Sequence, residues 1–197
     1  MTDLSRRAFL AVAGTGLGAA WLAARPEDVA GAHEHADAAR RAAARGEAPP
    51  PLEVLTPEQA ADIEAVASRI IPTDDLPGAR EAHVIQYVDR SLATWAADQR
   101  EPLLAGLARF NRLVARRHRG RSRFAELTAD QQLAFLSANA RDPFFQQARD
   151  LTILGMFANP SWGGNFEGAG WRVLGFEPRY AWQPPFGEYD AEPPRGN

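Results

Sequence analysis

The chain has 197 residues, with 22 basic and 25 acidic side chains and a formal net charge of −3. This near-neutral balance, without a ladder of basic and aromatic residues, argues against nucleic-acid binding. Cysteine is absent, which excludes thiolate-held iron–sulfur clusters, haem attached through C-x-x-C-H, and disulfides.

The N-terminal sequence is typical of a twin-arginine export signal, which directs folded proteins across the membrane. Ser5-Arg6-Arg7-Ala8-Phe9-Leu10 opens an uncharged, Gly/Ala-rich run over residues 8–24. That run is shorter than the roughly 20 apolar residues of a membrane-spanning helix. We expect residues 1–32 to be the signal, with Arg6, Arg7, Phe9 and Leu10 recognised by the twin-arginine translocase. The protein would then reach the periplasm or the outer face of the cytoplasmic membrane.

Three further segments follow the signal. Residues 33–51 are a polar spacer that ends in Pro49-Pro50-Pro51, and residues 52–180 carry the apolar periodicity of a folded domain. Residues 181–197, with four prolines among aromatic and acidic residues, predict an extended tail.

The first two predicted helices follow each other at the start of the domain. Thr56-Pro57-Glu58-Gln59 is a capping box with proline at the first helical position. An apolar stripe follows it, at Ile63, Val66, Ala67, Ile70 and Ile71. After a loop over residues 72–78, the spacing of Ile85, Val88, Leu92 and Trp95 predicts the second helix. We expect Asp74 or Asp75 to cap that second helix.

Three more helices complete the predicted domain. The third carries Leu103, Leu107, Phe110 and Val114. The fourth starts at the Thr128-x-x-Gln131 capping box, with Leu133, Leu136 and Ala140 on one face. The fifth starts at Asp142-Pro143 and buries Phe144, Ala148, Leu151 and Gly155. No sustained alternation of period two occurs, so the sequence predicts an all-α, irregular bundle of about five helices.

A glycine- and tryptophan-rich loop follows the fifth helix, over residues 161–176. Its glycines permit tight turns, and its two tryptophans and two phenylalanines supply a large apolar area. Two interpretations are open: the loop folds onto its own bundle, or it presents its aromatic side chains to another protein.

Residues 109–123 contain seven arginines. They form either a solvated face that favours the negative end of the third helix, or a docking surface for an acidic partner or anionic lipid. Arg116 and Arg117 are the candidates within this cluster.

The sequence contains no convincing set of catalytic residues. His33-Glu34-His35 lacks an identifiable third metal ligand. Asp74 and Asp75 lack the further oxygen ligands of a calcium loop. Neither a Gly-x-Ser-x-Gly nucleophile turn nor a lysine-containing phosphate loop is present. We therefore expect no catalytic, cofactor-binding or metal-binding residue in this chain.

Two blocks of sequence resemble the gluconate 2-dehydrogenase subunit 3 family. The first is residues 71–79, Ile-Pro-Thr-Asp-Asp-Leu-Pro-Gly-Ala, followed by residues 85–92. The second is residues 155–165, which end in Ser-Trp-Gly-Gly-Asn, together with Gly-Trp-Arg-Val-Leu-Gly-Phe at residues 170–176. The resemblance covers about residues 55–176.

The resemblance implies a non-catalytic small subunit of an exported sugar or sugar-acid dehydrogenase. In such complexes a glucose–methanol–choline-type large subunit holds FAD, and a multihaem cytochrome c commonly takes the electrons. The small subunit would bind the large one, support its maturation and supply its export signal. The alternative is a self-sufficient exported helical binding or envelope protein. The candidate contacts with the large subunit are Trp162, Asn165, Phe166, Trp171, Arg172, Phe176, Arg116 and Arg117.

Overall fold

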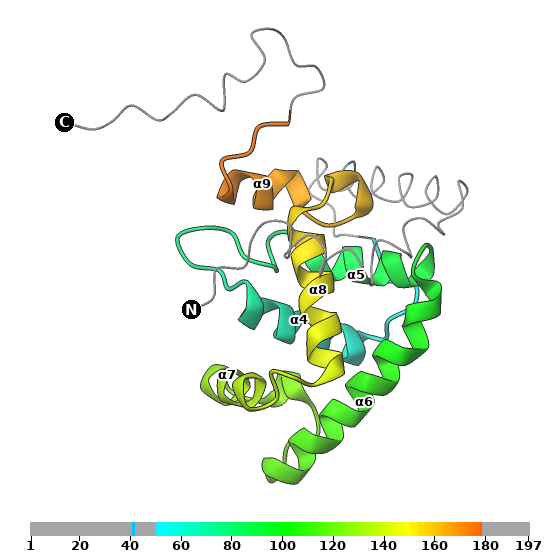
Figure 1. The fold of residues 1–197 in the computed structure, drawn as a ribbon, viewed down its shortest axis with the longest axis vertical. Coiled ribbons are helices and arrows are strands. Elements are labelled where there is room, and N and C mark those ends of the chain that lie inside the picture. The colour runs from blue at the N-terminus through cyan, green and yellow to red at the C-terminus, as the bar shows by residue number, and fades with distance from the viewer. Residues whose placement is uncertain (1–40, 42–49, 179–197) are drawn as a thin grey trace, which may run out of the picture.

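The computed structural model describes Arg41 and residues 50–178 (Figure 1). The export signal with Arg6, Arg7, Phe9 and Leu10, most of the spacer, and the proline-rich tail lie outside the described residues. Within the described part the fold is all-α, as predicted. The five predicted helices are α4 (Pro57–Ile70), α5 (Val84–Ala93), α6 (Arg100–Arg117), α7 (Ala129–Ala138) and α8 (Pro143–Phe157).

Helix α8 occupies the centre of the domain (Figure 1). It packs against α4, α5 and α6, and its C-terminal end meets α9 (Ala169–Val173), a short sixth helix formed by the glycine- and tryptophan-rich segment. Short 3-10 turns connect the longer elements: Ala97–Gln99, Phe124–Glu126, Pro160–Trp162 and Phe166–Gly168. Helices α7 and α9 lie at opposite ends of the molecule (Figure 1). The C-terminal segment is therefore a cap on one end of the bundle.

Aromatic side chains fill the core between α6, α7 and α8. The fully buried Phe110 ring lies 5.0 Å from both Phe135 and Phe144 and 5.7 Å from Phe124, measured between ring centroids. Gly106 of α6 faces Phe144, and a Cβ there would come within 3.0 Å of the Phe144 Cβ. Close contact between α6 and α8 thus depends on a glycine opposite a phenylalanine.

The predicted helix starts are confirmed at three of the four positions for which a cap was expected. Thr56 and Thr128 form capping boxes with Gln59 and Gln131, and Asp142 accepts the Phe144 N–H at 2.9 Å. The prediction for α5 was wrong. Asp74 instead accepts the Leu76 N–H at 2.8 Å inside the loop, and α5 starts after His83 without a side-chain cap.

The buried face of α7 also differs from the prediction. Leu133 is 57 % exposed, and Ala140 lies beyond the end of the helix. The face turned to the core carries Gln132, Phe135 and Leu136. Gln132 is buried because its Nε2 donates to the Phe124 carbonyl. A polar residue therefore lies on the buried face, where the apolar periodicity predicted Leu133.

A buried carboxylate joins three elements of the bundle. Asp62 of α4 is 1 % exposed and accepts from Asn111 Nδ2 of α6 at 2.7 Å and from the Ala125 N–H at 2.8 Å. Asn111 Oδ1 in turn accepts the Phe124 N–H at 3.0 Å. Each donor would be left without its partner if the carboxylate were removed, and unpaired buried polar groups are costly.

We therefore expect Asp62→Ala to lower the free energy of unfolding by about 2–3 kcal/mol, measured by urea denaturation. Asp75→Ala is the matched control, because that carboxylate is exposed in the loop before α5; its effect should stay within about 0.5 kcal/mol. Equal effects of the two substitutions would contradict the structural role of Asp62.

Candidate functional site

The C-terminal end of α8 is completed by the segment that follows it. The last carbonyls of a helix have no partner within the helix, and here three of them accept from residues 165 and 171. The Gly155 carbonyl accepts the Asn165 N–H at 2.7 Å, the Phe157 carbonyl accepts Trp171 Nε1 at 3.0 Å, and the Ala158 carbonyl accepts Asn165 Nδ2 at 2.8 Å. Residues 159–176, which we call the capping segment, thus fold back over the helix end.

Asn165 is the centre of the capping segment. It is fully buried, with φ of 46° in the left-handed region that asparagine adopts more readily than most residues. Its Nδ2 binds Ala158 and its Oδ1 accepts the Gly170 N–H at 2.8 Å. The side-chain amide supplies the donor and the acceptor on two separate atoms, so one side chain joins both backbone groups. Asn165 therefore contacts its own chain and has no exposed atoms for a partner.

Two glycines allow the capping segment to lie directly on the backbone of α8. A Cβ at Gly164 would lie 2.2 Å from the Gly155 carbonyl oxygen, and a Cβ at Gly170 would lie 1.9 Å from that of Met156. No side chain fits at either position without moving the backbone. The Gly-Gly-Asn and Gly-Trp blocks are therefore one structural unit.

Three predicted interface aromatics are half-buried against this chain. Trp162 packs edge-on against Trp95 at 4.8 Å between ring centroids, and Phe166 stacks on His83 at 4.3 Å. Trp171 is anchored to α8 through its indole N–H. Burial lowers the pKa of His83, although the carboxylates of Glu167, Glu64 and Glu81 oppose that shift. Of the two open interpretations, folding onto the bundle therefore describes these rings.

The exposed part of the capping segment lies at and after the end of α9. Leu174 is 63 % exposed and Phe176 is 49 % exposed, with the Phe176 ring 5.3 Å from Trp171. Arg172 is also exposed and donates to the Glu167 carbonyl. We call Trp171, Leu174 and Phe176 the α9 edge. Leu174 was absent from the predicted interface residues; its signal was an apolar residue three positions after a tryptophan, at the spacing of one helical face.

Helix α5 carries two buried charges beside the capping segment. Asp89, 1 % exposed, accepts the N–H groups of residues 53, 54 and 55 at 2.7–3.1 Å. Arg90 is 2 % exposed, and its Nη2 lies 3.9 Å from a Glu53 carboxylate oxygen. Burial lowers the pKa of Arg90, while Glu53 and Asp89 act in the opposite direction. Neither residue was singled out in the sequence, because nothing distinguishes them there from surface charges.

Gly163 lies over Arg90. Its φ of 100° is in the left-handed region, and a Cβ there would come within 3.3 Å of Arg90 Nη1. Among the residues that the structure describes, none accepts a hydrogen bond from Arg90 Nε or Nη1. The capping segment thus closes over a guanidinium group of α5 as well as over the end of α8.

Arg116 and Arg117 lie far from the α9 edge, at the end of α6 beside α7 (Figure 1). Arg117 sits over the Phe135 ring, with Cζ 5.5 Å from its centroid, so this cation contacts its own domain. Arg116 is exposed. The structure therefore separates the predicted interface residues into two groups at two ends of the molecule.

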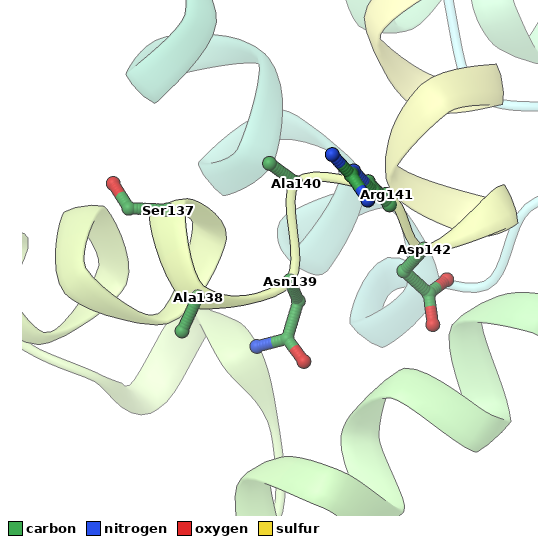
Figure 2. Close-up of a pocket in the computed structure, with 6 residues that line it drawn as sticks. All are labelled: Ser137, Ala138, Asn139, Ala140, Arg141 and Asp142. Carbon is green, nitrogen blue, oxygen red and sulfur yellow. The ribbon is translucent and has the colours of Figure 1, made fainter.

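The connection between α7 and α8 borders an open pocket of about 420 Å³ (Figure 2). Figure 2 shows Asn139 and Asp142 on the same side of this connection. Asn139 Nδ2 donates to the Phe135 carbonyl, and Asp142 caps α8 and binds Arg109 at 3.1 Å. The polar groups of Asn139 and Asp142 are therefore engaged in structural contacts of the α7–α8 connection.

Among residues 50–178, no three histidine or carboxylate side chains lie close enough together to hold a metal ion. In the same part of the chain, each helix is too short or too polar to cross a bilayer.

Within residues 50–178 the site is thus a hydrogen-bonded cap on a domain of six α-helices, with an apolar edge at its end. The model of one family, described as gluconate 2-dehydrogenase subunit 3, matches residues 57–178. The chain belongs to this family. No curated protein and no solved structure matches it.

Asn165→Ala should lower the free energy of unfolding by about 3 kcal/mol, because it leaves the Ala158 carbonyl and the Gly170 N–H unpaired and forces alanine to a positive φ. The measurement is urea denaturation. Asn165→Gly removes the same hydrogen bonds without the φ penalty and should cost about 1 kcal/mol less.

Asn159→Ala is the matched control, since that exposed side chain accepts only the Ser161 N–H, at 3.0 Å. It should cost about 1 kcal/mol or less. If Asn159→Ala proved as damaging as Asn165→Ala, the central place of Asn165 in the cap would be wrong.

Proposed function

We propose that this protein is the non-catalytic small subunit of an exported, FAD-dependent sugar or sugar-acid dehydrogenase of the glucose–methanol–choline type. In this proposal the FAD belongs to the large subunit, and a cytochrome c subunit is the electron acceptor where one is present. This chain binds the large subunit, supports its maturation and carries its export signal.

Family membership over residues 57–178 is the observation that carries the proposal. The residues outside that match add to it, since Arg6 and Arg7 stand in a twin-arginine pattern that serves folded cargo. The buried carboxylates Asp62 and Asp89 each bind two or three groups of this chain, so their hydrogen bonds support the fold.

The α9 edge is the surface that we assign to the large subunit. Two of the domain's most exposed large apolar side chains, Leu174 and Phe176, lie within three residues of each other there. Trp171 beside them is fixed by its bond to Phe157. Exposed apolar groups on a rigid base are typical of protein-binding sites, and a few such residues provide most of the binding energy.

The double variant Leu174→Ser/Phe176→Ser should bind the flavoprotein subunit at least about tenfold more weakly than the wild type, because two apolar anchors are lost. The measurement is co-purification with, and titration against, a glucose–methanol–choline-type flavoprotein subunit that is expressed together with this chain. Both substitutions are at exposed positions, so thermal unfolding should change little.

Leu133→Ser is the control, since Leu133 is 57 % exposed on α7 at the other end of the domain. It should bind like the wild type. A complex that forms with the wild type and is equally strong with the double variant removes the α9 edge from the interface; absence of any complex with the wild type overturns the proposed function itself.

Replacing Arg6 and Arg7 by Lys should leave the dehydrogenase activity in the cytoplasm, because the arginine pair is what the translocase recognises. Cell fractionation with an activity assay of the co-expressed complex measures this. Arg25→Lys, the next arginine along the chain, is the control and should leave export intact. Export of the Arg6/Arg7 variant at wild-type level would refute the shared signal.

A further inference from the structure

The outer side of α6 carries an uncompensated positive charge. Residues 109–123 hold seven arginines and no carboxylate. Three of the seven have partners within the domain: Arg109 with Asp142 at 3.1 Å, Arg123 with Glu126 at 3.4 Å, and Arg117 over the Phe135 ring. The other four are exposed and form no ion pair with any described residue: Arg112, Arg116, Arg119 and Arg121.

Helix geometry places these charges away from the core. At 100° per residue, Arg109, Arg112 and Arg116 fall on one face of α6, while Leu107, Phe110 and Val114 form the buried opposite face. Figure 1 shows α6 along one border of the molecule. The arginine face therefore points to solvent over the C-terminal half of the helix, and we call it the α6 arginine face, with Arg119 and Arg121 as its continuation.

Stability of the isolated domain does not explain this face. Arg112 and Arg116 are four residues apart on the helix, a spacing at which like charges repel. The favourable interaction with the helix dipole extends only over the last turn, which includes Arg116 but not Arg112. The repulsion between these charges therefore slightly disfavours the helix, and no described residue offsets it by an ion pair with Arg112 or Arg116.

The other side chains of this face indicate which kind of partner it suits. Leu113 lies among Arg109, Arg112 and Arg116, but it is half-buried and packs against the core, and none of the exposed large apolar side chains of residues 50–178 lies on α6. Surfaces that bind a bilayer interface carry bulky apolar residues that insert among the lipids, and this face exposes no such residue. Its guanidinium groups instead suit a protein surface whose carboxylates bind arginine in bidentate geometry.

We propose that the α6 arginine face is a second docking surface, which receives a carboxylate-rich protein surface. This inference rests on the proposed function in one respect, since the occupant to which we assign it is the flavoprotein subunit, contacted at a place separate from the α9 edge. In this proposal the α9 edge provides apolar contacts, while the charges of the α6 arginine face orient the partner and raise the association rate constant.

The test compares Arg112→Glu/Arg116→Glu with the wild type in binding the flavoprotein subunit, by stopped-flow or surface plasmon resonance with the full chain. At about 50 mM salt the association rate constant should fall about tenfold or more, with a small change in the dissociation rate. The difference should largely disappear at about 500 mM salt, where screening is strong.

Arg80→Glu/Arg149→Glu is the matched control. It changes the net charge by the same amount at the exposed Arg80 of the loop before α5 and the half-exposed Arg149 of α8, which form solvent-accessible ion pairs with Glu64 and Asp150 of this chain. Its association rate constant should stay within about twofold of the wild type. A complex that forms with unchanged association in the α6 variant overturns this inference and leaves the proposed function standing.

Two further measurements would show that the α6 arginine face binds something other than the flavoprotein subunit. Binding of the wild-type chain to phosphatidylcholine vesicles with about 30 % phosphatidylglycerol, lost in the α6 variant while association with the flavoprotein is unchanged, would show a lipid surface instead. Self-association by analytical ultracentrifugation, lost in the same variant with flavoprotein binding unchanged, would show a second copy of this chain. Failure of the wild type to bind the flavoprotein at all would refute the proposed function and this assignment of the occupant together.

Discussion

The open C-terminal end of α8 is the constraint on which the rest of the domain depends. This helix is central, so its last carbonyls cannot all turn to water as they would on a surface helix. Asn165 and Trp171 donate to three of them. Because those donors come from the capping segment, the position of α9 and of the α9 edge follows from the hydrogen bonds of the preceding helix, α8.

The same constraint explains the unusual composition of the capping segment. Where the backbone of the capping segment lies against the carbonyl oxygens of α8, there is no room for a side chain. Glycine is therefore required at the two contacts, Gly164 and Gly170. The aromatic rings then fill the space on either side, Trp162 against Trp95 and Phe166 against His83. The glycines and the tryptophans thus serve the same purpose, which is to pack the capping segment onto the end of α8. Neither residue type alone indicates a binding site.

The helices could be predicted from the sequence because their signals are local. Capping boxes at Thr56 and Thr128 and the apolar period of α6 and α8 depend on neighbours within one or two turns. The errors arose where a distant residue decides the outcome. Gln132 is buried because the Phe124 carbonyl needs a donor, and α5 starts without a carboxylate cap because the chain enters it through a left-handed His83.

The candidate site was harder to predict, because contacts between residues far apart in the sequence decide which of its side chains are buried. Sequence alone grouped Asn165, Trp171 and Phe176 together, whereas the fold buries the first, anchors the second and exposes the third. In the proposed complex, the large subunit would meet Leu174 and Phe176 on a segment already ordered by the hydrogen bonds of Asn165 and Trp171. Ordering an interface usually opposes association, so a segment that is ordered by its own helix cap makes a better docking surface than a free loop of the same residues.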